Sequence, residues 1–290
     1  MARIAKASTS RKPANAAGKI KPADFVSALA RGIEVLRLFS EHQPQVTTSE
    51  VAERTGLSRA AARRFLLTLT ELGYLSNQQE SFSPLPKMLE LGYSYLSTWN
   101  FREIVQPYLE EVVQELSENC SFAVLDGSDV VYLSRAEARR IVQSVTISVG
   151  TRVPAAVSAL GRVLLAHLPP AELNRILNPE LLKPVTPRTI TDPVLFAERL
   201  ATVRDQGYAL VEGEFEEGLI SVAVPVFDAE GRAVAAINVG TPMTRANAEQ
   251  VKSQFLPAIQ RAAENISRAF VTRSRNVDHE LVVRRGFSEG

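Results

Sequence analysis

Three helical segments follow one another between Phe25 and Leu85, and no other feature of this chain limits its possible folds as strongly. The first has apolar residues at helical spacing and ends before Pro44. Thr47–Glu50 then forms a capping-box pattern, with a hydroxyl followed three residues later by a carboxylate. This pattern predicts a short second helix from Ser49 to Arg54, which Gly56 ends.

A third helix and a hairpin complete the segment. Ser58 caps a helix that runs to about Leu72, and its inward positions are Ala62, Phe65, Leu66 and Leu69. Short alternating stretches around a polar turn follow Gly73 and predict a small hairpin. A short helix, a tight turn, a longer helix and a hairpin make a winged helix-turn-helix domain over residues 25–86. Residues 87–100 are predicted to form a linker helix.

The third helix is the candidate DNA contact. Small residues and arginines lie outside its apolar face, and arginine binds guanine or phosphate. Two such helices of a dimer would contact a pseudo-palindromic operator in double-stranded DNA. Alternatively, these arginines only solvate the helix exterior, but the capped helix before them and the hairpin after them favour DNA. The predicted DNA-binding residues are Thr48, Ser58, Arg59, Ala60, Arg63 and Arg64.

The charge distribution is consistent with this prediction. Residues 1–87 have 13 Lys/Arg against 7 Asp/Glu, a net charge of +6, and the remaining residues have a net charge of −5. A basic N-terminal part followed by an acidic C-terminal part favours a polyanionic partner for the N-terminal part. Residues 1–24 are predicted to be a disordered basic tail, with an organellar transit peptide as the alternative.

Composition excludes several other classes. No apolar run approaches the roughly 18 residues of a membrane-spanning helix, so we expect no membrane partner. A single cysteine and three scattered histidines predict no disulfide framework, no metal site and no cofactor, and fit a reducing, cytoplasmic compartment. The chain lacks the nucleophile-elbow, zinc-protease, P-loop and dinucleotide-binding motifs, which predicts that it is not an enzyme.

A second domain is predicted over residues 101–272, with a C-terminal tail at 273–290. An amphipathic helix leads into a hairpin that turns at Asp126-Gly127, and another strand is expected at 142–149. Three helices, three alternating strands and a long terminal helix follow. This order predicts an α+β fold in which an antiparallel sheet leaves one face open.

Several features of this domain favour an acidic effector. Ser158 caps a helix whose N–H groups attract anions, Arg152 lies in the loop before it, and Arg135 ends a strand. An arginine fork beside a helix N-terminus would hold a carboxylate, and the sequence leaves open which arginine faces the pocket. Ser158 could equally be only a cap, and Arg152 a surface residue.

Motifs in both domains resemble those of IclR-type transcriptional regulators. They include residues 30–36, 57–69 and 73–75 of the first domain and 149–154, 158–166 and 217–225 of the second. The resemblance covers about residues 25–270. It implies that the linker helix joins the winged helix-turn-helix to a GAF-like effector-binding domain, and that the protein binds DNA as a homodimer or a dimer of dimers.

Within this family, residues 150–155 and Gly161-Arg162 resemble the aromatic-acid branch, the Pca- and Pob-type regulators. That branch controls the breakdown of protocatechuate, 4-hydroxybenzoate and β-ketoadipate. Most other members have Lys at Arg162 and commonly His at Ala156, which favours the branch over a glyoxylate- or pyruvate-type effector. The resemblance implies a pocket lined by Ser158, Ala159, Leu160, Ser221 and Asn238.

Some assignments in the pocket stay open. Asn238 lies in an apolar strand, where its amide either contacts the ligand or makes a structural hydrogen bond. The acidic residues from Glu212 to Glu217 form a solvated loop, or one of them accepts from a ligand hydroxyl. Two other functions compete with the aromatic-acid regulator: a regulator of another carbon pathway, and a GAF-like sensor that acts only through protein partners.

Overall fold

The computed structural model describes residues 21–40, 43–99, 101–138, 147–177 and 181–276. The chain divides into two compact units, with the boundary between Trp99 and Asn100. The predicted basic tail lies almost wholly outside the described residues, as does residue 277 onward. Each unit is an α+β structure with an antiparallel sheet, and this confirms the predicted fold class.

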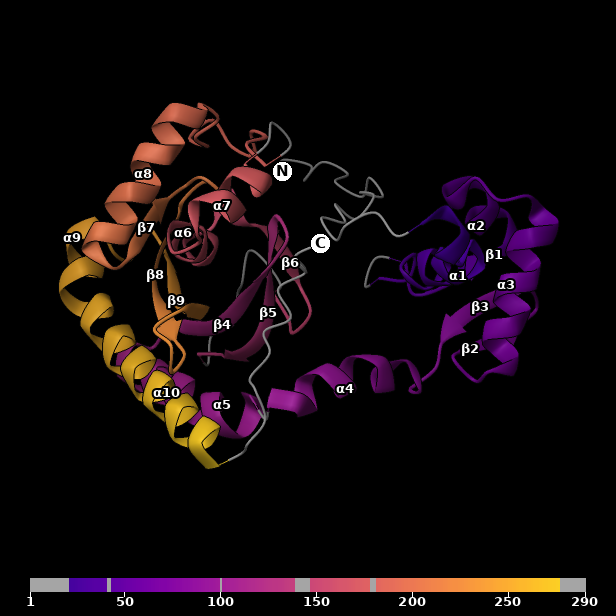
Figure 1. Ribbon diagram of the computed structural model, residues 1–290, viewed down its shortest axis with the longest axis horizontal. Coiled ribbons are helices and arrows are strands. Elements are labelled where there is room, and N and C mark those ends of the chain that lie inside the picture. Colours follow the sequence, from indigo (N-terminus) through magenta and orange to yellow (C-terminus); the bar gives the residue numbers. More distant parts are fainter. Residues whose placement is uncertain (1–20, 41–42, 100, 139–146, 178–180, 277–290) are drawn as a thin grey trace. The chain divides into compact units, whose positions relative to one another are not determined.

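The N-terminal unit is a winged helix-turn-helix (Figure 1). Its sheet has the order β1-β3-β2, and the β2–β3 hairpin is the wing. A core of eight buried apolar residues, among them Val35, Val51, Leu66 and Phe82, joins the helices to this sheet. The elements are α1 (Ser27–Leu36), β1 (Val46–Thr47), α2 (Thr48–Thr55), α3 (Arg59–Glu71), β2 (Leu75–Gln78), β3 (Ser81–Pro84) and α4 (Met88–Trp99), after a 3-10 turn at Pro22–Asp24.

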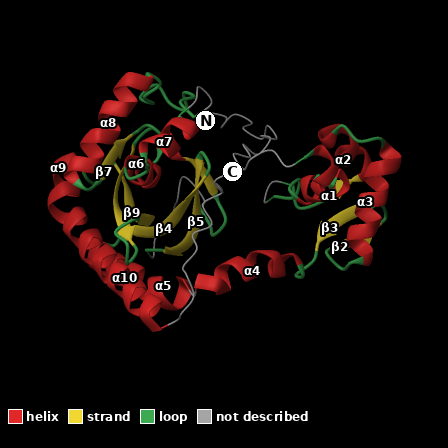
Figure 2. Cartoon of the chain, viewed as in Figure 1, coloured by secondary structure: helices red, strands yellow, loops and turns green. Residues whose placement is uncertain are grey.

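The C-terminal unit is built on a six-stranded antiparallel sheet with the order β6-β5-β4-β9-β8-β7 (Figure 2). Its strands are β4 (Asn119–Asp126), β5 (Asp129–Ala136), β6 (Arg152–Pro154), β7 (Ala209–Glu212), β8 (Leu219–Phe227) and β9 (Ala233–Pro242). Its helices are α5 (Phe101–Leu116), α6 (Ala159–Ala166), α7 (Pro170–Ile176), α8 (Pro193–Gln206), α9 (Ala248–Gln250) and α10 (Leu256–Asn276). A 3-10 turn at Ala155–Val157 precedes α6, and a π turn at Val251–Phe255 joins α9 to α10.

Helices cover both faces of this sheet. On β4, Phe122 contacts Phe270 of α10 edge to face, while its neighbour Ala123 belongs to the core around α6. This alternation places α5 and α10 outside the curve of the sheet and α6 inside it (Figure 1). The prediction of one open face is therefore wrong. The eight residues of α6 are all buried, because the helix is apolar nearly all round.

Several predicted boundaries also differ. The first helix, predicted to end before Pro44, ends at Leu36, and the terminal helix extends to Asn276, into the predicted tail. The strand predicted at 142–149 lies mostly outside the described residues, and its described part, 147–149, is not a strand. The strand that lies beside β5, at that edge of the sheet, is β6.

Close packing explains one glycine inside a helix. A Cβ at Gly161 would collide with the backbone of Ala155, so only glycine lets α6 lie directly on the 3-10 turn before it. This contact places the N-terminus of α6 over the sheet.

Candidate functional site

The outer face of α3 is a basic surface. Ser58 is the N-cap, and its hydroxyl accepts from the N–H of Ala61 at 3.2 Å. Ala62, Leu66 and Leu69 are buried against the core. The remaining predicted contacts on this helix, Ser58, Arg59, Ala60, Arg63 and Arg64, are all exposed.

The three arginines of this face have only weak internal partners. Arg59 donates to the Ser49 hydroxyl at 2.7 Å, and Nε of Arg63 lies 3.9 Å from Oε1 of Glu80 in the wing. No ion pair involves Arg64 in the described part of the chain. Exposed ion pairs contribute little to stability, so these guanidinium groups are available to a phosphate or a base edge.

The C-terminal unit encloses a partly open cavity of about 150 Å³ on the α6 face of the sheet. Ser121, Arg135 and Asn238 line it from one cross-strand row, because Ser121 pairs with Arg135 on one side and with Asn238 on the other. Ser158 and Ala159 line it from the start of α6. The loop between β7 and β8 completes the wall with Glu214, Phe215 and Glu216.

Arg135 gives the cavity a cationic side. Its side chain is only 12% exposed; Nη1 donates to the Ser121 hydroxyl at 3.1 Å, and Nε pairs with Glu137 at 3.1 Å. Tyr132 lines the same cavity, and burial raises the pKa of its phenol to about 12. The phenol therefore stays protonated and can donate a hydrogen bond, so this part of the cavity suits an anion.

Ser221 and Asn238 form a hydrogen-bond chain on the neighbouring strands. Nδ2 of Asn238 donates to the Ser221 hydroxyl at 2.9 Å, and that hydroxyl donates to the carbonyl of Val239 at 3.2 Å. The amide thus makes a structural hydrogen bond and lines the cavity, and both alternatives considered for Asn238 remain compatible with the structure.

Comparisons with known proteins identify the family of both units. The IclR helix-turn-helix domain model matches residues 28–79, and the model of the bacterial transcriptional regulator IclR C-terminal domain matches residues 93–268. The chain belongs to the IclR family of bacterial transcriptional regulators. Because these are DNA-binding regulators, the predictions of a DNA-binding function and of no enzymatic activity are confirmed.

Three relatives illustrate where the chain falls within the IclR family. The Pca regulon regulatory protein of Pseudomonas putida is 38% identical over 84% of this chain and 84% of its own length. The p-hydroxybenzoate hydroxylase transcriptional activator of Acinetobacter baylyi is 35% identical over 86% of this chain and 93% of its own. A crystal structure of an IclR homologue from Microbacterium hydrocarbonoxydans, complexed with 4-hydroxybenzoate, is 27% identical with a TM-score of 0.73 and covers 84% of this chain and 98% of its own. The resemblance to the aromatic-acid branch is confirmed.

Three predicted site residues of this IclR-family chain lie elsewhere. Thr48 is the first residue of α2 and is buried. The N-cap is the residue before it, Thr47, whose hydroxyl and N–H exchange hydrogen bonds with Glu50. Leu160 is buried in the core around α6 and does not line the cavity. Arg152 is at the surface, where Nη1 pairs with Asp126 at 2.7 Å and Nε with Asp129 at 3.2 Å.

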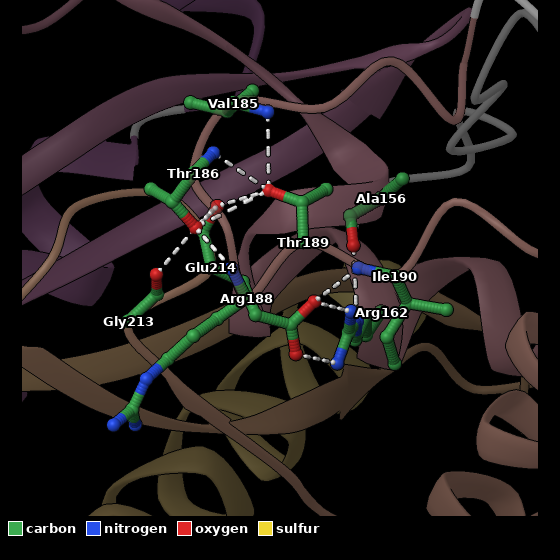
Figure 3. Close-up of polar contacts among 9 residues, drawn as sticks. All are labelled: Ala156, Arg162, Val185, Thr186, Arg188, Thr189, Ile190, Gly213 and Glu214. Atoms are coloured by element: carbon green, nitrogen blue, oxygen red, sulfur yellow. Dashed lines mark hydrogen bonds and ion pairs between the residues drawn. The ribbon is translucent and has the colours of Figure 1, made fainter.

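A buried ion pair beside the cavity was not predicted. Arg162 of α6 and Glu214 of the β7–β8 loop face each other (Figure 3), and their side chains are 2% and 10% exposed. Nη1 of Arg162 donates to Oε1 of Glu214 at 2.7 Å, Nη2 donates to Oε2, and Nε donates to the carbonyl of Ala156 at 2.9 Å. Burial lowers the pKa of Arg162, and the contacts with Glu214 oppose this shift.

The segment before α8 holds the same loop. Thr189 Oγ1 donates to the carbonyl of Glu214 at 2.9 Å, and Thr186 Oγ1 donates to the carbonyl of Gly213 at 2.7 Å (Figure 3). The acidic cluster is therefore not a solvated loop throughout, since Glu214 is a structural partner and Glu216 lines the cavity. One signal was available in the sequence: an arginine within the apolar run 159–166 requires a buried acceptor.

The described residues include no cluster of three or more His, Cys, Asp or Glu that could hold a metal ion. Burial raises the pKa of Cys120 to about 12, which keeps this thiol protonated and unreactive inside the sheet. None of the described helices is both long and apolar enough to cross a bilayer.

Proposed function

We propose that this regulator senses a small aromatic carboxylate in the cavity of its C-terminal unit and controls a catabolic operon for aromatic acids in the cytoplasm. The observation that carries the proposal is the cavity itself, which combines the volume of one aromatic ring with a guanidinium group at one side. An apolar protein cavity of about 150 Å³ binds benzene, so a single ring fits such a space.

Arg135 is the proposed partner of the effector's carboxylate. Its guanidinium is largely buried and lies in the same row as Ser121, so it can hold a carboxylate by a charge-assisted hydrogen bond. Arg152 is already occupied by two aspartates at the surface. Ser158 and Ala159 contribute the N-terminus of α6 to the same wall.

Relatives support the chemical class. The names of two of them refer to the Pca regulon and to p-hydroxybenzoate hydroxylase, and a homologue of known structure is complexed with 4-hydroxybenzoate. Two of the three names thus refer to 4-hydroxybenzoate, and this chain covers at least 84% of the length of each of the three proteins.

The DNA-bound form is proposed to be a dimer, or a dimer of dimers, on a pseudo-palindromic operator. Helix α4, helix α1 and the two residues before α1 expose large apolar side chains, which a monomeric domain would leave in water. A second copy of the N-terminal unit would cover them and place two α3 helices for two half-sites. The exposed side chains are Phe25, Val26, Leu29, Ile33, Leu89, Leu91, Tyr93 and Tyr95.

Ligand binding is proposed to change operator affinity through α4 and α5. Gln106 of α5 accepts from the Ser134 hydroxyl at 2.7 Å and donates to the carbonyl of Arg135 at 3.3 Å, so α5 is attached to the strand that presents Arg135. The effector must bind one of two dimer states more tightly for this mechanism to operate.

A thermal-shift panel on the purified full-length protein tests the proposal. Protocatechuate, 4-hydroxybenzoate, β-ketoadipate, muconate, glyoxylate and pyruvate are each added in large excess. An effector at a hundred times its Kd stabilises the folded protein by about 2.7 kcal/mol, which gives a clear shift in Tm. A shift with an aromatic acid supports the proposal, and a shift only with glyoxylate or pyruvate contradicts it.

A further inference from the structure

The wing of the DNA-binding unit carries negative charge on a surface that faces a polyanion. From Leu75 to Pro84 the sequence has one charged residue, Glu80, and no Lys or Arg. Phosphate groups are bound by cations, so a carboxylate at this surface lowers its affinity for any DNA. Glu80 therefore requires a role other than binding the DNA backbone.

The tip of the wing holds Glu80 in a fixed place. Gln78 of β2 pairs with Ser81 of β3, so Gln79 and Glu80 form a two-residue turn. Their φ angles are 51° and 64°, in the left-handed region that glycine and asparagine adopt most easily. The N–H of Glu80 also donates to Oδ1 of Asn77 at 3.2 Å. The hairpin register and this hydrogen bond fix the backbone from which the carboxylate projects.

The carboxylate of Glu80 lies beside α3. Strand β2 packs against this helix (Figure 1), and Oε1 of Glu80 is 3.9 Å from Nε of Arg63. The side chain of Glu80 is 71% exposed and that of Arg63 is 56% exposed. An ion pair in water contributes little to folding stability. Its effect is therefore expected on what Arg63 binds rather than on the stability of the unit.

The position of the carboxylate leaves one part of the Arg63 guanidinium free. Glu80 approaches Nε, and no other described residue forms an ion pair with Arg63. The two outer nitrogens, Nη1 and Nη2, form a fork that can donate to O6 and N7 of guanine. A carboxylate on the Nε side orients this fork and competes with phosphate for the same guanidinium.

The other two arginines of α3 lack such a partner within the described chain. Nη2 of Arg59 donates to the Ser49 hydroxyl, which is neutral, and no described ion pair involves Arg64. A phosphate can attract either side chain without displacing a carboxylate. Arg63 is therefore the arginine of this surface for which phosphate binding is most disfavoured.

We infer that Glu80 is a positioning residue for DNA specificity, which keeps Arg63 for a base edge and disfavours its binding to phosphate. The inference rests on α3 being the DNA contact of the proposed function. On non-operator DNA, Arg63 must leave the carboxylate to reach a phosphate. On the operator, Nη1 and Nη2 bind the base while Nε stays beside Glu80. The wing thus lowers the affinity for non-operator DNA more than the affinity for the operator.

Titrations of the full-length protein with operator DNA and with non-operator DNA of the same length test this inference. The operator is one that the wild-type protein enriches from random-sequence DNA. Glu80→Gln removes the charge and keeps the size, and Gln79 shows that this turn accepts glutamine at a positive φ.

We expect Glu80→Gln to lower the Kd for non-operator DNA about 3- to 10-fold and to change the operator Kd less than about 2-fold. The preference for the operator then falls by roughly the first factor. The slope of log affinity against log salt concentration on non-operator DNA should steepen by about 0.9, because one more phosphate is bound.

Glu71→Gln is the matched control. Glu71 is an exposed carboxylate of the same unit and lies roughly 12 Å further along α3 than Arg63. This variant makes the same change in net charge and should alter both affinities by the same factor. In an Arg63→Ala background, Glu80→Gln should no longer change the preference for the operator, since the carboxylate acts through Arg63.

The possible outcomes separate this inference from the assignment of α3. If Glu80→Gln changes both affinities by the same factor, as Glu71→Gln does, the inference is wrong and the pair is only a solvated contact. If Glu80→Gln changes the preference equally in the Arg63→Ala background, Glu80 acts on the DNA directly and the inference is also wrong. If Arg63→Ala binds the operator like wild type, Arg63 is not a DNA contact and the inference fails with that assignment.

Discussion

Helices α3 and α6 begin in the same way and perform different tasks. Each is capped by a serine whose hydroxyl accepts from the N–H three residues on, and each has an arginine within its first two turns. On α3 the arginines face solvent, whereas on α6 Arg162 is almost completely buried against Glu214. The arginines differ because α3 buries only one face, whereas α6 is buried all round and leaves Arg162 no route to solvent. The serine cap and the nearby arginine alone therefore do not determine an arginine's role.

The largest expected effect concerns the buried arginine. Arg162→Met leaves the Glu214 carboxylate buried without its cation and should lower the free energy of unfolding by about 3 to 5 kcal/mol. The double variant Arg162→Met/Glu214→Gln removes the stranded charge and should recover much of the loss. Urea unfolding of both variants measures this, and an Arg162→Met protein as stable as wild type would contradict the structural role of the pair.

A second test compares Arg135 with Arg152, because the sequence left open which of the two faces the pocket. Arg135→Gln should weaken binding of an aromatic carboxylate by about 10- to 100-fold, because it removes a charge-assisted hydrogen bond in the cavity. Arg152→Gln is the matched control and should leave the Kd unchanged, since Arg152 pairs with surface aspartates. Calorimetric titration measures both, and equal losses would contradict the assignment of Arg135.

On the exposed helix, substitutions should change binding without changing stability. Arg59→Ala or Arg63→Ala should cost about 1 to 3 kcal/mol of operator affinity if that side chain contacts bases, and less than about 0.5 kcal/mol of folding stability. Arg261→Ala removes an equally exposed arginine from the C-terminal unit and serves as the control. Operator titrations at two salt concentrations measure the effect; wild-type affinity in both α3 variants would exclude α3 as the DNA contact.

The smallest expected effect is the loss of folding stability when the serine cap of α3 or of α6 is removed. Ser58→Ala should cost about 1 kcal/mol, because water can replace the lost acceptor at an exposed helix start. Ser158→Ala should cost more, about 2 kcal/mol, because it leaves the N–H of Gly161 buried without an acceptor. Thermal unfolding of both variants gives the order, and an equal cost would indicate that water reaches the start of α6.

Local patterns predicted the DNA-binding unit closely. The capping hydroxyls, the glycine turn and the apolar spacing placed α2, α3 and the wing within a few residues of their positions in the structure. Thr48 was predicted to contact DNA, but as the first residue of α2 its side chain is buried, and only the packing of α2 in the core shows this.

Such local patterns predicted less of the candidate effector site. Its walls come from β4, β5, β8, β9, the start of α6 and a loop, and their juxtaposition depends on sheet order rather than on any local signal. Glu214 appeared to be one more acid in a polar run, although its partner lies 52 residues earlier.

The sequence by itself determined where helices begin, which face of α3 carries charge and to which family the chain belongs, because caps and periodicity act over a few residues. Only the tertiary structure decided that Arg135 rather than Arg152 borders the cavity and that Arg162 is buried. Strand register and the packing of α6 on the sheet fix these arrangements, and both are long-range interactions whose strength depends on burial.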